Sequence, residues 1–145
     1  NTYIFIDFYV LEWHDAAILK IVVDRSYPES HNQIRLDVQW PDSDNTFSSI
    51  YFVDFIDFKV DLCGGIICDE TIMCASIEEI TRKTTDSRFK YEYDEIIRST
   101  GEKITHHSNE KIYKYEIETA TTNGLIAIVA KGFYLTEKYS EYRGA

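Results

Sequence analysis

Hydrophobic and polar residues alternate most cleanly over residues 33–40. The apolar side chains on one face of this stretch are Ile34, Leu36, Val38 and Trp40, and the residues between them are polar. A period of two predicts a β-strand with one buried side and one side facing solvent. The polar segment 41–45 then supplies turn residues, and the next strand is expected to start near Thr46, so the pattern predicts a hairpin.

Several other runs are rich in β-branched and aromatic residues, and we expect them to form strands. They are residues 16–24, 49–62, 66–69, 71–77, 111–121 and 125–136. The mostly apolar part from Ile50 to Phe55 predicts either a strand covered on both faces or a bulge. Gly64-Gly65 predicts a tight turn, and Asn123-Gly124 predicts a type I′ hairpin turn.

One segment, Asp86–Thr100, has helical periodicity. Its apolar stripe consists of Phe89, Tyr93, Ile96 and Ile97. Asp86 or Ser87 can cap the start of this helix, and Gly101 follows its end. The polar tail after Glu137 is expected to fray.

These elements predict a single domain over residues 1–145, of the α+β class but predominantly β. We expect a twisted antiparallel sheet or half-open barrel of about seven to eight strands, with one helix before a C-terminal hairpin. No stretch approaches the ~18 to 20 consecutive apolar residues of a membrane span. The segment Tyr3–Leu11 contains Asp7 and has no basic region before it, so it does not predict a signal peptide. Because the chain begins with Asn1, a native and a processed start both remain open.

The three cysteines, Cys63, Cys68 and Cys74, are five and six residues apart. An odd number without a CxxC pair argues against a disulfide framework and against a zinc site. Their apolar neighbours predict buried free thiols. Free thiols favour a reducing compartment, so we expect a cytoplasmic protein.

Negative charge is concentrated in the first half of the chain. The net charge is −10, of which residues 1–72 contribute −9 and residues 73–145 contribute −1. This balance disfavours a nucleic-acid partner, because nucleic acid carries negative charge. We expect no membrane partner either. Two interpretations stay open: a solvated face that only keeps the protein dispersed, or a surface for a basic protein partner. For the second, we expect an acidic face made of Asp37, Asp42, Asp44, Asp57 and Asp61.

Residues Trp13, His14 and Asp15 form a polar-aromatic site candidate before the strand at 16–24. His14 beside Asp15 would suit a general base oriented by a carboxylate, which would make a hydrolase. The alternative is that Trp13 is buried at one end of the core and its neighbours bond nearby backbone groups. No third catalytic partner is evident, and His106-His107 has poor spacing for one metal ion. We therefore expect no enzyme activity, no metal and no cofactor.

Several segments together resemble small bacterial proteins with a Trp-His-Asp start, a β-rich family that includes predicted immunity proteins of polymorphic toxin systems. The matching segments are Glu12-Trp13-His14-Asp15, the strand through Val23-Asp24, the alternating strand ending at Trp40, Gly65-Ile66-Ile67 with Ile72 and Ala75, and Ala130-Lys131-Gly132-Phe133. The resemblance spans residues 10–136. It implies a mainly β domain in the bacterial cytoplasm and carries over no catalytic residue.

The residues and the resemblance together predict a non-enzymatic acidic binding protein. The immunity-like version would neutralise a basic toxin domain by occlusion. The alternative is a homo-oligomeric or small-ligand-binding domain without catalytic activity, with a homodimer as one form and a ligand held near Trp13 and His14.

Overall fold

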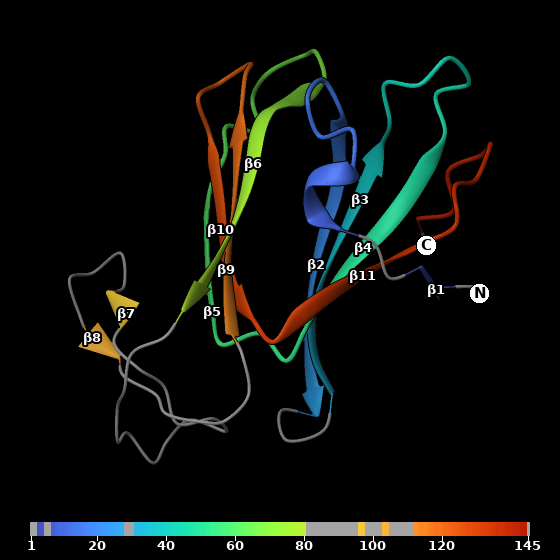
Figure 1. Cartoon of the computed structure of the whole chain (residues 1–145). Coiled ribbons are helices and arrows are strands. Elements are labelled where there is room, and N and C mark those ends of the chain that lie inside the picture. The colour runs from blue at the N-terminus through green and yellow to red at the C-terminus, as the bar shows by residue number, and fades with distance from the viewer. Residues whose placement is uncertain are drawn as a thin grey trace.

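Antiparallel strands account for nearly all of the secondary structure in the computed structural model (Figure 1). The structure describes residues 3–4, 7–27, 31–80, 96–97, 103–104 and 112–144. Its elements are β1 (Tyr3–Ile4), the 3-10 helix η1 (Phe8–Val10), β2 (Ala17–Tyr27), β3 (His31–Gln39), β4 (Phe47–Val53), β5 (Asp57–Asp61), β6 (Glu70–Ile80), β7 (Ile96–Ile97), β8 (Lys103–Ile104), β9 (Ile112–Thr119), β10 (Leu125–Ala130) and β11 (Gly132–Thr136). The predicted twisted, predominantly β sheet is confirmed.

The main sheet has nine strands in the order β1-β11-β4-β3-β2-β6-β9-β10-β5, and it is not closed. Figure 1 shows it folded into two wings: β2, β3, β4 and β11 form the first, and β6, β9, β10 and β5 form the second. Strands β2 and β6 join the wings through only two residue pairs, Ala17 with Thr71 and Ile18 with Glu70. Elsewhere, β4 passes into β5, and β10 into β11, through short bends between the wings.

The core lies between the inner faces of the two wings. Strand β3 shows why, because its three alternating apolar residues and Trp40, which follows the strand, are all at most 1% exposed. Strands β9 and β10 contribute Tyr115, Ile117, Ile126 and Ile128 from the opposite wing. The ring centroids of Phe52 and Tyr115 lie 5.0 Å apart, which joins the wings by an edge-to-face aromatic contact.

Trp13 is buried at the end of this core, as its aromatic character predicted. Its side chain is 5% exposed, and its Nε1 donates a hydrogen bond to the Phe8 carbonyl oxygen at 2.7 Å. The ring contacts Phe8 at 4.7 Å and Trp40 at 5.7 Å, measured between ring centroids. Trp13 therefore fixes η1 against the core.

The C-terminal tail is docked on the first wing, so the expectation that it frays is wrong. Tyr139 and Phe47 exchange two backbone hydrogen bonds of 2.8 Å each. Tyr142 stacks on the Phe47 ring and donates a hydrogen bond from its hydroxyl group to Asp37 at 2.9 Å. The tail is polar overall, but its tyrosines Tyr139 and Tyr142 contact the outer face of the sheet at Phe47.

The predicted helix Asp86–Thr100 lies outside the described residues except at Ile96 and Ile97. These two residues form β7, which pairs with β8, so the helix prediction is wrong there. The isoleucines fit the apolar stripe of a helix, but β-branched side chains suit a strand equally well. Within the described part of the chain, no helix is long and apolar enough to cross a membrane.

The C-terminal hairpin of β9 and β10 is confirmed, but its turn is longer than predicted. Residues 120–124 form a five-residue loop in place of a two-residue type I′ turn, and Asn123 has a φ of 52°. Gly124 is buried, and a Cβ atom built on it would lie 2.7 Å from the Asp61 carbonyl oxygen. The loop therefore needs glycine for close approach to the end of β5.

Candidate functional site

Three loops gather at one end of the sheet, and we call this region the loop end. It consists of the turn 12–16, residues 61–74 (the end of β5, the loop to β6 and the start of β6), and residues 116–125 around the hairpin loop. The Asp15 amide donates to the Ile72 carbonyl oxygen at 2.8 Å, and the Thr121 hydroxyl donates to the Asp69 carbonyl oxygen at 3.0 Å. These bonds hold the loops against one another.

The loop end has a strongly one-sided charge. Residues 12–16 contain two carboxylates, residues 61–74 contain three and residues 116–125 contain two, while none of these segments contains Lys or Arg. The seven acidic residues are Glu12, Asp15, Asp61, Asp69, Glu70, Glu116 and Glu118. Five of them are exposed, and Glu70 and Glu116 are half-buried. A cluster of this kind raises the local concentration of a basic partner.

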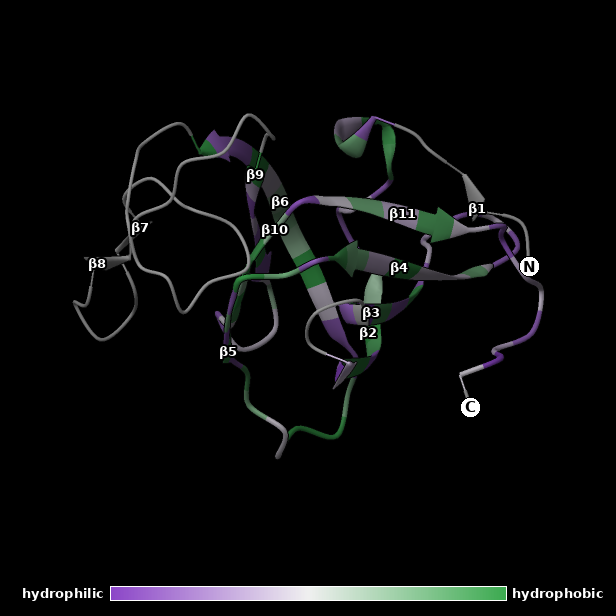
Figure 2. Ribbon diagram, turned by 90° about the horizontal axis from the view of Figure 1, so that it is seen from below, coloured by the Kyte–Doolittle hydropathy of each residue, from purple (hydrophilic) through white to green (hydrophobic). Residues whose placement is uncertain are grey.

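An apolar projection accompanies these carboxylates. Ile67 is fully exposed in the loop after β5, and Figure 2 shows this loop extending from the body with partly hydrophobic colouring. Met73 is 45% exposed because β6 shifts register between Ile72 and Cys74. Such a bulge redirects a side chain out of the regular alternation. The loop end therefore offers apolar contact area within an acidic rim.

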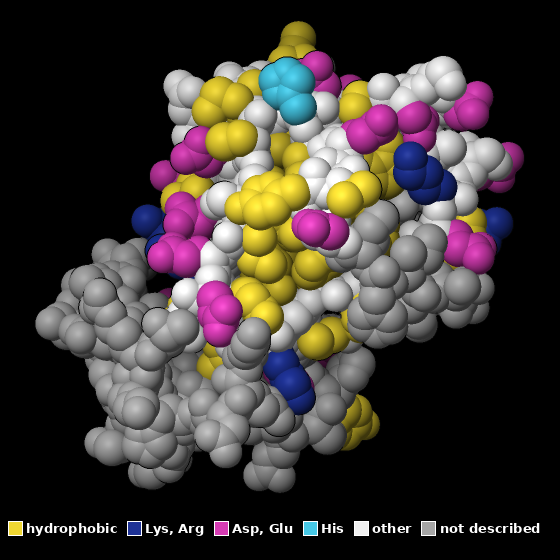
Figure 3. All heavy atoms as spheres, in the orientation of Figure 1, with side chains coloured by type: hydrophobic (Ala, Val, Ile, Leu, Met, Phe, Trp, Pro, Cys, Tyr) yellow, Lys and Arg dark blue, Asp and Glu magenta, His cyan; other side chains and the backbone are white. Residues whose placement is uncertain are grey.

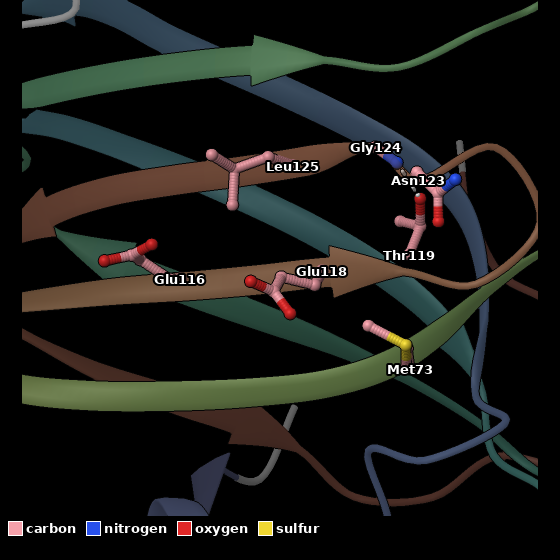
Figure 4. A pocket seen from close by; sticks show the side chains of 7 residues that line it. All are labelled: Met73, Glu116, Glu118, Thr119, Asn123, Gly124 and Leu125. Carbon is pink, nitrogen blue, oxygen red and sulfur yellow. Dashed lines mark hydrogen bonds between the residues drawn. The ribbon is translucent and has the colours of Figure 1, made fainter.

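A shallow pocket of about 300 Å³ opens beside this projection. Figure 4 shows that its walls come from β6, β9, the hairpin loop and the start of β10. The lining residues are Met73, Glu116, Glu118, Thr119, Asn123, Gly124 and Leu125. Thr119 stabilises the wall, since its hydroxyl oxygen accepts a hydrogen bond from the Gly124 amide at 2.8 Å. The two glutamates make the pocket suitable for a cation or a basic side chain.

All three cysteines belong to the loop end and are exposed, so the prediction of buried thiols is wrong. Cys63 and Cys68 lie in the loop after β5, where Leu62 packs against the core but Ile67 is fully exposed. The Cys74 thiol donates to Glu118 Oε2 at 3.0 Å. This hydrogen bond and partial burial raise the pKa of Cys74, which favours the less reactive thiol over the thiolate.

The turn Trp13-His14-Asp15 separates into a buried tryptophan and two surface residues. Nδ1 of His14 lies 2.9 Å from the Met73 carbonyl oxygen, and His14 Nε2 lies 3.7 Å from Asp15 Oδ2. The two side chains are 75% and 67% exposed. The turn brings these neighbours together, but their contact is long and open to water. Their visible role is structural, because His14 and the backbone of Asp15 both bond to β6.

The five aspartates expected on one acidic face do not share a surface. Asp37 is 1% exposed, because the C-terminal tail covers the outer face of β3. Asp42 and Asp44 lie in the turn after β3, while Asp57 and Asp61 lie on β5 in the second wing. Hydrogen bonds from Thr46, first from its side chain and then from its backbone, lower the pKa of Asp42 to about 2. Of the five, only Asp61 belongs to the loop end.

Asp37 belongs to a buried polar cluster and is not part of a solvent-exposed face. Its Oδ1 lies 3.1 Å from Arg35 Nε and accepts a hydrogen bond from the Ser49 hydroxyl at 2.7 Å. Tyr142 donates to Asp37 Oδ2, and burial with this bond raises the pKa of Tyr142 to about 12. The regular alternation of β3 placed Asp37 correctly on the outer face but gave no sign that another segment covers that face.

The sequence reasoning missed Ile67, Met73 and Glu118 as surface residues of a site. The usable signal was the stretch 61–74, which holds three carboxylates and no basic residue. Among the described residues, no group of three or more His, Cys, Asp or Glu side chains could hold a metal ion. Comparison with protein-family models, with curated proteins and with solved structures finds no match.

Proposed function

We propose that the chain is a non-enzymatic binding protein that occludes a basic toxin domain with its loop end, as an immunity-like protein of the bacterial cytoplasm. The observation that carries this proposal is the absence of Lys and Arg from three spatially adjacent segments that hold seven carboxylates. Toxins that cleave nucleic acid need cationic surfaces, because they bind phosphate. A carboxylate cluster can occupy such a surface and accelerate encounter through electrostatic steering.

The apolar projection gives this surface a means of holding its partner after encounter. Charges at the rim of an interface mainly raise the association rate, whereas a few central, desolvated side chains supply most of the affinity. Ile67 and Met73 are available for that role, because both are exposed beside the carboxylates. The exposed position of His14 also supports binding in preference to general-base catalysis, which works best in a positioned, partly desolvated group.

The salt dependence of binding tests the electrostatic part of the proposal. The measurement is calorimetric titration with a basic toxin domain whose gene neighbours that of this chain, at about 50 mM and about 500 mM NaCl, which differ severalfold in Debye length. We expect the affinity to fall by at least about tenfold at the higher salt concentration. Binding that is equally tight at both concentrations, or no binding at all, would contradict the proposal.

The pocket supports a second candidate, a small-ligand-binding domain. Glu116 and Glu118 beside Leu125 would suit an organic cation with an apolar part. Titration with spermidine, a simple cationic probe, separates the two candidates. Saturable binding of spermidine that is lost in Glu118→Gln, without any binding of a basic protein, would favour the small ligand.

A further inference from the structure

Strands β2 and β6 separate after their two residue pairs, and the inner face of β2 is left partly open. Val23 pairs with Ile34 of β3, which is 0% exposed, yet Val23 itself is 45% exposed. Side chains of cross-strand neighbours point to the same face of a sheet. Val23 therefore faces the core side without being covered, which means that the core is open along the second half of β2.

Exposed apolar side chains are concentrated on η1 and β2, the two elements that border this opening. Nine large hydrophobic residues are exposed among the described residues, and five of them lie on η1 or β2. These five are Tyr9, Val10, Leu19, Val23 and Tyr27. Figure 3 shows apolar side chains gathered in the middle of the face where, in the same orientation as Figure 1, β6 and β2 diverge. Contiguous exposed apolar surface of this kind marks interaction sites.

The two strand edges that border the opening differ in how they are protected. On β6, the Tyr9 hydroxyl accepts a hydrogen bond from the Ile77 amide at 3.1 Å and donates one to the Ile77 carbonyl oxygen at 3.3 Å. This side chain occupies the position that a neighbouring strand would take. On β2, no strand pairs with the edge beyond Ile18 in the described part of the chain. An unprotected edge is a template for a further strand.

We propose that the edge of β2 from Leu19 to Val23 accepts an extended, basic segment of a protein partner as an added strand. Main-chain hydrogen bonds to β2 would hold the segment, and its alternate apolar side chains would cover the open core beside Val23. The edge from Leu19 to Val23 shares no residue with the loop end, and Glu12 is the one loop-end carboxylate that also borders the opening.

Charge identifies a basic segment as the occupant. The exposed carboxylates beside the opening are Asp7 and Glu12, which flank η1, and Glu79 on β6. The exposed bases on β2 are Lys20 and Arg25. Lys20 pairs with Asp37 and donates to the Gly144 carbonyl oxygen, so its side chain lies on the outer face, away from the opening. A second copy of this chain would bring another net charge of −10 to the contact. Like charges brought together oppose association, so a segment with alternating apolar and basic residues fits better.

The test uses an acetylated and amidated peptide of four alternating Val-Lys pairs. Hydrogen exchange of the amides from Leu19 to Val23 is measured by NMR with and without the peptide. We expect exchange to slow by at least about tenfold with this peptide. The same peptide methylated on its backbone nitrogens keeps its charge but cannot pair with a strand, and we expect it to give no protection.

Two protein variants provide a matched comparison. Val23→Lys should weaken binding of the peptide by about tenfold or more, which corresponds to about 1.4 kcal/mol. Val60→Lys adds the same charge to an exposed valine on β5 and should leave binding unchanged. Protection confined to the loop end, equal binding of the methylated peptide, or equal loss in both variants would overturn the proposal. Protection of β2 by dimerisation in the absence of peptide would also overturn it, in favour of a second copy.

Discussion

Replacing Trp13 with alanine is expected to lower the free energy of unfolding by about 3 to 5 kcal/mol. The indole ring is buried against Phe8 and Trp40, so its removal leaves a cavity at the end of the core. It also leaves the Phe8 carbonyl oxygen without the hydrogen bond from the indole nitrogen. Urea unfolding followed by circular dichroism measures the change.

His14→Ala is the matched control for Trp13→Ala, because it truncates the adjacent, exposed side chain. We expect its effect to stay within about 0.5 kcal/mol, as is usual for surface substitutions. The free energy of unfolding of Trp13→Phe should lie between those of the two variants, since this variant keeps an aromatic ring but loses the indole donor. A stability of Trp13→Ala equal to that of the parent would show that the ring does not support the core.

Asp37→Ala is expected to lower the free energy of unfolding by about 2 to 3 kcal/mol. Removing one partner of a fully buried ion pair costs about 3 to 5 kcal/mol. The cost should be smaller here because Arg35 is 20% exposed and keeps some contact with water. The variant also removes the acceptor of the Tyr142 hydroxyl, so the tail should loosen from the sheet.

Asp44→Ala is the comparison for Asp37→Ala, because Asp44 is exposed in the turn that follows the same strand. Its unfolding free energy should match that of the parent. A spectrophotometric titration gives a second readout: in Asp37→Ala the pKa of Tyr142 should fall from about 12 toward the usual tyrosine value. An unchanged titration together with unchanged stability would contradict the described cluster.

Local patterns predicted the strands well because they depend on short-range alternation. Strand β3 is the clearest case, since its apolar residues are in the core and its polar residues are on the other face. The loss of apolar-polar alternation between Ile50 and Phe55 predicted a covered strand or a bulge. Strand β4 instead keeps a regular alternation of burial without a register shift up to Val53, and the chain leaves the strand at Asp54, which has a φ of 50°. The wings themselves follow from long-range pairing, which no local pattern reveals.

The site was harder to predict, because it depends on which segments meet. The alternation placed Asp37 on the outer face, but only the fold shows that Tyr142, 105 residues away, covers it. The apolar residues next to Cys63 and Cys68 in the sequence predicted that both thiols are buried. Both thiols are exposed, because they lie in a loop that projects from the body. Charge composition was the more reliable signal, since the segment 61–74 lacks basic residues wherever it lies in the fold.

Charge reversal at the loop end tests the proposed binding surface most directly. The measurement compares the affinity of the parent chain for the basic toxin domain with that of the double variant Asp61→Lys, Asp69→Lys. The control is Glu137→Lys, Glu141→Lys, which makes the same change in net charge at two exposed positions of the C-terminal tail. A third variant, His14→Ala, distinguishes inhibition by occlusion from catalysis, because only a catalytic mechanism would need the His14 side chain.

We expect the loop-end variant to bind about 100-fold more weakly and to lose protection of cells that produce the toxin, because each reversal places a lysine against a basic surface. The tail control and His14→Ala should bind and protect as the parent does. Equal weakening by the tail control, or full protection by the loop-end variant, would contradict the loop end as the binding surface. Loss of protection in a correctly folded His14→Ala, with binding intact, would contradict occlusion itself.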